Sequence, residues 1–257
     1  IGICVPSWTP VEENHPRNHE GSHFSCLVTR THDHPKPGSD EISRACEEGW
    51  IGPARGRWEE HSLAFQGRVT AHDGTEHDEV FVVNMPCDPT FRGTAPLGGT
   101  MQHRPLPPLG TTQRRLTFTE NRKHRGIQGV RHWLRSSPDG ARIAFLMRDD
   151  HGVSQLWTIS PRGGDPVQLT HHDFDIGSAF TWSPNGRWIA YGLAGDVAVT
   201  DTLSGATRSI TTTTDGRGPV RPEACVFSPD GRQIAYLRQV YGETSAWNQI
   251  FVAEFDP

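Results

Sequence analysis

Short apolar segments alternate with polar turns along the second half of the chain, and they recur at a fixed period. The tetrapeptide Ser-Pro-Asp/Asn-Gly begins at Ser137, Ser183 and Ser228, in steps of 46 and 45 residues. Each copy follows a short apolar segment and precedes an Ile-Ala-aromatic strand. Because the Pro-Asp/Asn-Gly turn reverses the chain, each repeat predicts a hairpin. A period of about 45 residues is typical of one four-stranded propeller blade.

Further strands complete the predicted repeat. A third strand follows at 155–159, 197–199 and 249–252, and fourth strands end at Leu169-Thr170 and Ile210-Thr211. No amphipathic helical stretch of about ten or more residues separates the strands after Thr111, which excludes a βαβ protein. We therefore predict an all-β fold, a β-propeller of four-stranded antiparallel blades. Three blades fall at about 131–170, 178–211 and 223–257, the last without a fourth strand.

The first half of the chain predicts a stretched version of the same blade over about 20–118. Its strands are expected at 23–30, 62–69, 79–85 and 114–118, with insertions at 31–60 and 86–113. In the first insertion, Ser39-Asp40-Glu41 precedes residues 42–48 in a pattern that indicates a capped helix, long enough to act as a lid. The whole chain, 1–257, is then one partial propeller domain showing about four blades of a ring of about six to eight.

Composition and charge limit the kinds of partner that the chain is expected to bind. The 257 residues are 34% hydrophobic with a net charge of -5, so no cationic field exists to attract nucleic acid. No apolar run approaches the roughly 20 residues that span a bilayer. The five cysteines form no CxxC pair, which favours free thiols over a disulfide framework or a thiolate zinc site. Because the chain opens with Ile1 rather than Met, we expect a longer protein.

The repeat resembles the WD40-like blades of the TolB propeller domain and of many peptidase and lyase propellers. Longer stretches resemble the YidR-like family of bacterial proteins, over almost the whole chain. The stretches that carry this resemblance are Gly21-Ser22-His23, 37–42, 47–50, 113–118, Arg131-His132-Trp133 and 144–150. The resemblance implies further N-terminal blades and a cytoplasmic protein, and it implies no particular activity.

A more distant similarity is to oligogalacturonate lyases, propellers that hold a divalent metal with channel-facing histidines and cleave acidic sugars by β-elimination. It rests on fold and on histidine placement, with no lyase motif matched residue by residue. This similarity implies a metal-assisted reaction without assigning catalytic residues.

The blade repeat also predicts where ligands would bind. Loops that lead into a blade's inner strand surround the mouth of the central channel. Six residues before each repeated proline lie His132, Ser178 and Glu223, and His23 begins the first predicted inner strand. His23, His132 and Glu223 could together hold a divalent metal. The alternative is that such polar residues only tie a loop to a neighbouring strand by a hydrogen bond.

Other candidates lie nearby in the predicted fold. Asp40 and Glu41 could act as general acid and base, as metal ligands, or simply as a solvated helix face. Arg131 could bind a substrate carboxylate bidentately or form a salt bridge within its blade. His171 and Asp175 follow an outer strand, in a loop directed toward the mouth.

These features favour a propeller without catalytic activity that binds a small acidic or carbohydrate ligand, or a protein partner, at the channel mouth. The alternative is a metal-assisted lyase or hydrolase acting on uronate-type oligosaccharides. No GxSxG, Walker, HExxH or EF-hand motif occurs, so serine hydrolase, nucleotide-binding, zincin and EF-hand functions have no support in the sequence.

Overall fold

The computed structural model describes residues 2–6, 23–52, 61–94, 97, 105–129, 133–212 and 218–257. The regular elements of these residues are all β-strands, which confirms the predicted all-β class. The chain forms two compact units, residues 1–118 and 119–257, each built around its own sheets.

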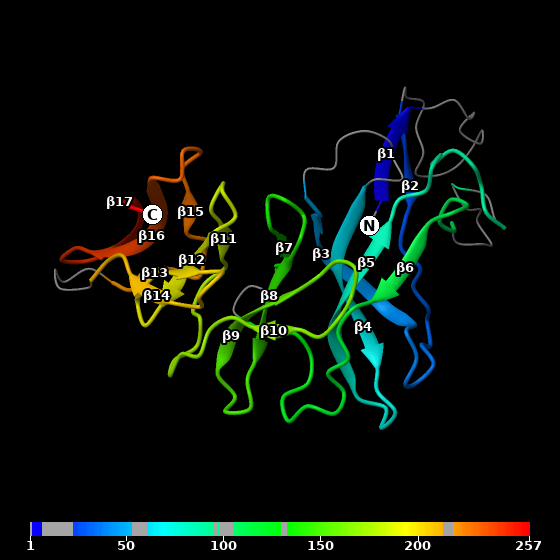
Figure 1. The fold of residues 1–257 in the computed structure, drawn as a ribbon, viewed down its shortest axis with the longest axis horizontal. Coiled ribbons are helices and arrows are strands. Elements are labelled where there is room, and N and C mark those ends of the chain that lie inside the picture. The colour runs from blue at the N-terminus through cyan, green and yellow to red at the C-terminus, as the bar shows by residue number, and fades with distance from the viewer. Residues whose placement is uncertain are drawn as a thin grey trace. The chain divides into compact units, whose positions relative to one another are not determined.

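The second unit contains three antiparallel sheets in sequence order (Figure 1). The first sheet consists of β7 (Arg135–Ser136), β8 (Ile143–Arg148), β9 (Ser154–Ile159) and β10 (Val167–Gln168). The second consists of β11 (Thr181–Trp182), β12 (Trp188–Leu193), β13 (Asp196–Asp201) and β14 (Thr207–Ser209). The third has only β15 (Val226–Phe227), β16 (Gln233–Tyr241) and β17 (Ala246–Glu254). Each strand pairs with its neighbour in the chain, as the repeat predicts.

The repeated tetrapeptide explains the first hairpin of each sheet. The Ser137 hydroxyl donates to Asp139 Oδ1 at 2.5 Å and accepts from the backbone N–H of Arg142 at 3.0 Å. Gly140 has a φ of 74°, a left-handed conformation that side chains disfavour. The same serine-to-Asp/Asn contact occurs in the other two copies. The turn therefore sets the register of the hairpin through local contacts alone.

Within the second unit, the short inner strands of neighbouring sheets are linked directly. The Thr181 hydroxyl donates to the carbonyl of Cys225 at 2.5 Å, and the Trp182 indole N–H donates to the carbonyl of Arg135 at 3.0 Å. Between the first two sheets lie buried apolar side chains that include Phe180 and Tyr191. This arrangement of successive sheets joined along their inner strands is that of adjacent propeller blades.

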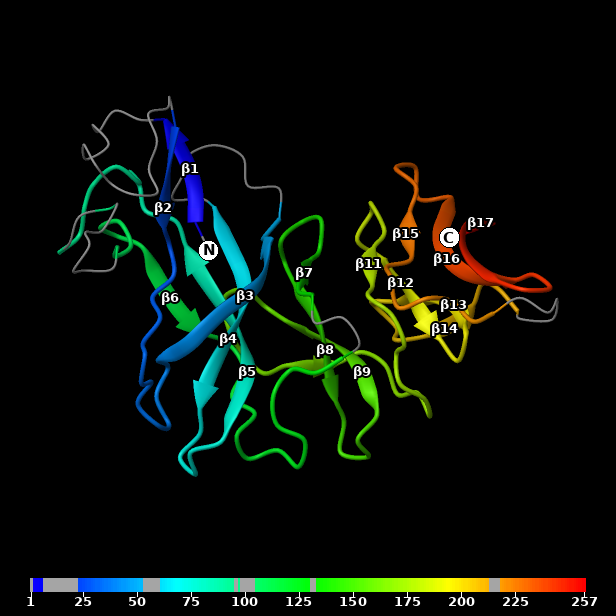
Figure 2. The same ribbon diagram turned by 180° about the vertical axis from the view of Figure 1, so that it is seen from behind.

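The described residues of the first unit form one four-stranded sheet and one two-stranded ribbon. The sheet is built from β3 (Ile42–Trp50), β4 (Ser62–Thr70), β5 (Glu76–Asn84) and β6 (Thr112–Arg115), in that order (Figure 2). The ribbon pairs β1 (Gly2–Pro6) with β2 (His23–Leu27). Phe65 and Phe81 stack on the sheet with ring centroids 5.6 Å apart and are fully buried.

Two predictions for this unit are wrong. Residues 42–48 form part of strand β3 rather than a helix, because Ile42 pairs with Val69 of β4 and is fully buried in the core. The first strand of the sheet is therefore β3, while the predicted inner strand at 23–30 contributes β2 to the separate ribbon. Since 42–50 belongs to the sheet, it is not a lid. A bulge between Cys46 and Gly49, with Glu47 at a φ of 55°, interrupts the pairing of β3.

Candidate functional site

A pocket of about 630 Å³ opens inside the first unit, between the chain leading into β3 and the chain leading into β6. Its polar lining includes Asp40 and Glu41, both singled out from the sequence, and brings Arg30, His32 and Gln113 beside them. The rest of the lining consists of Val28, Gly93, Thr94, Leu106, Pro107, Pro108, Leu109, Gly110 and Thr111.

Gln113 joins the two walls of the pocket. Its side-chain Oε1 accepts from the backbone N–H of Arg30 at 2.9 Å, and its Nε2 donates to the carbonyl of Arg30 at 3.2 Å. This amide thus pairs with both backbone groups of Arg30, in the manner of a neighbouring strand. The exposed Arg30 side chain makes no ion pair with any residue that the structure describes.

A tight turn places the two carboxylates in the lining. The Ser39 hydroxyl donates to the carbonyl of Lys36 at 2.6 Å, and the Glu41 carboxylate accepts from the Lys36 backbone N–H at 2.8 Å. The Gly38 N–H donates to the carbonyl of Thr70 at 2.8 Å, which ties the turn to β4. The Ser-Asp-Glu sequence resembles a helix N-cap because both motifs use the same short side-chain bonds to the backbone.

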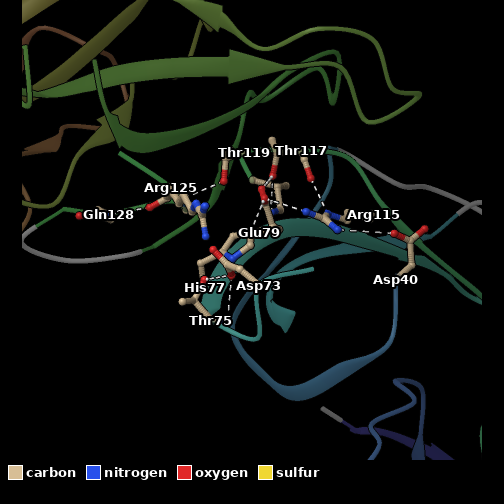
Figure 3. Close-up of polar contacts among 12 residues, drawn as sticks. Asp40, Asp73, Thr75, His77, Glu79, Arg115, Thr117, Thr119, Arg125 and Gln128 are labelled. Carbon is tan, nitrogen blue, oxygen red and sulfur yellow. Dashed lines mark hydrogen bonds and ion pairs between the residues drawn. The ribbon is translucent and has the colours of Figure 1, made fainter. Parts of the chain in front are cut away.

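Asp40 is connected to the interior through Arg115 (Figure 3). Its Oδ1 lies 3.8 Å from Arg115 Nη1, and Arg115 Nη2 donates to Glu79 Oε1 at 2.9 Å. The Arg115 Nε also donates to the carbonyl of Thr117 at 2.7 Å, and the guanidinium lies 4.7 Å from the ring centroid of Phe118. The Arg115 side chain is 6% exposed and the Asp40 side chain 61% exposed. A buried cation therefore lies behind an accessible carboxylate.

The Glu79 carboxylate is fully buried and heavily bonded. His77 Nε2 lies 3.0 Å from Glu79 Oε1, and the Thr117 hydroxyl donates to the other oxygen. A buried carboxylate is tolerated when it is paired and hydrogen-bonded in this way. Figure 3 shows His77 and Glu79 of β5 gathered with Arg115, at the end of β6, and Thr117, which follows that strand. The cluster holds the Arg115 guanidinium in place.

One side of the pocket is apolar. Leu106, Pro107, Pro108 and Leu109 follow one another in the lining, and Leu109 is 67% exposed. The Leu109 N–H donates to the carbonyl of Phe91 at 2.9 Å, which connects the two ends of this loop. The lining therefore combines an apolar, proline-containing segment with hydrogen-bonding groups.

The sequence-predicted residues of the second unit have local structural partners. Asp175 Oδ1 accepts from the N–H of Ser154 at 2.7 Å, and His171 Nδ1 lies 3.0 Å from Gln168 Nε2. The Ser178 hydroxyl accepts from the Gly192 N–H at 2.7 Å and donates to the carbonyl of Ala179 at 2.6 Å. Ser178 thus ties its loop to β12. Glu223 lies 3.8 Å from Arg221 Nε.

The proposed metal ligands come from different parts of the chain. His23 lies in β2 of the first unit and Glu223 in the second, while Arg131 and His132 lie outside the described residues. Within the described ranges, no group of three or more His, Cys, Asp or Glu side chains is arranged to hold a metal ion. A joint site of His23, His132 and Glu223 stays a prediction.

No helix of the described chain is long and apolar enough to cross a membrane.

Sequence reasoning missed the interior of this site. His77, Glu79 and Arg115 are separated along the chain, and no motif joins them. A signal was present for Glu79, since a carboxylate directly precedes the apolar run 80–83 in a strand expected to be buried. A charged group there requires a cation from another strand.

Successive antiparallel sheets with the repeated hairpin define a β-propeller. Several solved structures are similar at low identity, including a TolB protein and the tricorn protease. TolB from Acinetobacter baumannii is 18% identical, with 79% of this chain and 41% of that chain covered and a TM-score of 0.46. The tricorn protease is 14% identical, with 80% and 15% covered and a TM-score of 0.46. No protein-family model matches the chain.

Sequence comparison finds a curated relative that matches most of the chain. The chain is 45% identical over 242 residues to a protein of Escherichia coli strain K12 described as uncharacterized protein YidR. The match covers 92% of this chain and 56% of that relative, so the chain spans little more than half the relative's length. The chain is therefore similar to YidR over most of its own length, as the sequence resemblance indicates.

Proposed function

We propose that the first unit binds a small carbohydrate ligand, rich in hydroxyl groups, in the pocket between 28–41 on one side and 93–94 with 106–113 on the other. The observation that carries this proposal is the composition of the lining: the pocket is lined both by Asp40 and Glu41 and by the apolar segment Leu106-Pro107-Pro108-Leu109. Carboxylates accept hydrogen bonds from sugar hydroxyls, and an apolar wall covers the C–H face of a sugar ring. A volume of about 630 Å³ is in the range of small-molecule sites.

The charge of the lining favours a neutral sugar over an acidic one. The lining holds two carboxylates, Asp40 and Glu41, and one guanidinium, that of Arg30. His32 Nδ1 lies 3.9 Å from Glu41, and Arg115 lies behind Asp40, outside the lining. An anionic ligand would meet repulsion from both carboxylates, whereas a neutral polyol would use them as acceptors. Arg30, whose side chain makes no described ion pair, can donate to ring or hydroxyl oxygens.

The network behind Asp40 supports binding by ordering the site in advance. Because Arg115 is held by Glu79 and lies 3.8 Å from Asp40, this carboxylate has less freedom to lose when a ligand arrives. Pre-ordering of this kind raises affinity without adding contacts. The proposal is therefore a binding function, with no reaction assigned to the pocket.

Calorimetric titration of the chain with neutral mono- and disaccharides and with matched uronic acids tests the proposal. We expect at least one neutral sugar to bind more tightly than its uronate. Asp40→Asn should weaken that binding by about tenfold, as expected for loss of a charge-assisted hydrogen bond. The matched control is Asp150→Asn, since Asp150 lies 3.7 Å from Arg122 in the second unit and is 86% exposed.

The outcomes that contradict the proposal are distinct. Unchanged affinity in Asp40→Asn would place the ligand elsewhere. Preferential binding of uronates, together with a stoichiometric divalent metal in elemental analysis, would replace the proposal with the lyase or hydrolase alternative. Absence of binding to every neutral sugar would also refute it.

A further inference from the structure

Every complete sheet of the described chain secures its outer strand with the same dipeptide, an aliphatic residue followed by threonine. The three pairs are Leu116-Thr117, Leu169-Thr170 and Ile210-Thr211, and their partners on the third strand are Val80, Leu156 and Val197. The aliphatic N–H donates to the partner's carbonyl at 2.8, 2.8 and 2.7 Å, in that order. The threonine Oγ1 accepts from the same partner's N–H at 2.8, 2.9 and 3.0 Å.

The threonine hydroxyl proton has a fixed acceptor as well. In each sheet it goes to the residue immediately before the third-strand partner: Glu79, Gln155 or Asp196. Three hydrogen bonds thus join one dipeptide of the outer strand to one dipeptide of the third strand. We call this arrangement the threonine latch.

The last sheet contains the receiving half of this latch. Gln249-Ile250 of β17 corresponds to Gln155-Leu156 of β9, because Ile250 pairs with Leu237 as Leu156 pairs with Leu146. Both pairs combine an amide side chain with an aliphatic residue. Among the described residues, no strand pairs with the outer edge of β17.

The side chains of β17 are exposed where a fourth strand would cover them. All six residues of β9 are buried, whereas Ile250 and Val252 are 75% and 59% exposed. Trp247, on the same strand, is 51% exposed. An exposed, apolar edge strand is a template for strand addition.

We propose that the outer edge of β17 docks an extended strand that carries an aliphatic-threonine pair, supplied by the part of a YidR-type chain that lies outside these 257 residues. The three described latch dipeptides are already engaged in their own sheets, so none of them can occupy this edge. The relative described above is longer than this chain, which spans 56% of it, so a full YidR-type chain has residues from which the strand can come.

A synthetic peptide with the sequence of residues 113–118, Gln-Arg-Arg-Leu-Thr-Phe, tests the edge directly. We expect it to bind the 257-residue chain in a calorimetric titration, with chemical-shift changes at Ile250. A second peptide with valine in place of threonine loses two hydrogen bonds and should bind about tenfold more weakly. Equal affinity of the two peptides would overturn the latch.

A pair of chain variants locates the contact. Gln249→Ala should weaken binding of the threonine peptide but not of the valine peptide, because only threonine donates to Gln249. Asn248→Ala is the matched control on the neighbouring position, and it should affect neither peptide. If Gln249→Ala leaves the threonine peptide unaffected, the proposed register is wrong.

The source of the strand is tested by hydrogen exchange in the longer Escherichia coli YidR chain. The amide aligned with Ile250 should be protected from exchange in the monomer of the long chain and unprotected in the 257-residue chain. Fast exchange in the long monomer would refute supply from the same chain. Protection that appears only with dimerisation would identify a second copy as the occupant instead.

Discussion

Replacing Arg115 with methionine removes the cation from the buried cluster behind Asp40. Glu79 is fully buried, and Arg115 lies 2.9 Å from its carboxylate. Removing one partner of a buried ion pair typically costs about 3–5 kcal/mol, because the remaining charge is left uncompensated. Glu79 keeps bonds from His77 and Thr117, so we expect the lower end, about 3 kcal/mol.

Urea unfolding followed by circular dichroism measures this loss, with hydrogen exchange at the Val80 amide as a local probe of the first unit. Arg44→Met is the matched control, because Arg44 lies 3.6 Å from Asp78 with its side chain 53% exposed. An exposed pair of this kind contributes about 0–1 kcal/mol. Both variants remove one positive charge, so a larger loss of stability in Arg115→Met reports the burial of its ion pair.

A second substitution tests the cause. Glu79→Gln removes the uncompensated charge, so the Arg115→Met/Glu79→Gln double variant should be more stable than the sum of the single losses by about 1–3 kcal/mol. If Arg115→Met costs less than about 1 kcal/mol, or if the two losses simply add, the cluster is not a coupled ion pair.

Three further results are expected. Burial raises the pKa of the Cys225 thiol to about 12, so Cys225 should resist a thiol-specific reagent at pH 8 while exposed Cys87 reacts; rapid native labelling of Cys225 would contradict this. The backbone N–H of Leu203, with help from Arg187, lowers the pKa of Asp201 below its ordinary 3.8. The carboxylate therefore stabilises the fold above that value, and the destabilisation by Asp201→Asn in urea unfolding should be full at pH 7 and shrink as the pH falls below about 4. Thr170→Val should cost about 1–3 kcal/mol by leaving the Leu156 N–H unsatisfied, lowering the thermal midpoint by several degrees, whereas exposed Thr212→Val should leave it unchanged.

The elements that sequence predicted well are those whose contacts are local. Ser137 and Asp139 bond to each other and to the turn they form, so the tetrapeptide alone specifies a hairpin. Strand β3 was mispredicted because its identity depends on Ile42 pairing with Val69 across the intervening segment. Local preference for a helix was overridden by that distant partner.

In the candidate site, too, local features could be predicted from the sequence and contacts between distant residues could not. Asp40 and Glu41 could be selected from the sequence as accessible carboxylates, but the reason given, a helical lid, was wrong. Their neighbours Arg30 and Gln113 come together only because two separate loops enclose one pocket. No motif or spacing in the sequence predicts that Arg30 and Gln113 lie together.

The threonine latch also has a consequence for how these blades vary. The connection between β5 and β6 runs from residue 85 to 111, whereas that between β9 and β10 runs only from 160 to 166. Both connections deliver an outer strand to the same three hydrogen bonds, so the register of that strand is independent of the length of the loop before it. Loops at this position can therefore lengthen, shorten and change their residues without shifting the sheet, which makes them the part of each blade most open to acquiring a new binding surface.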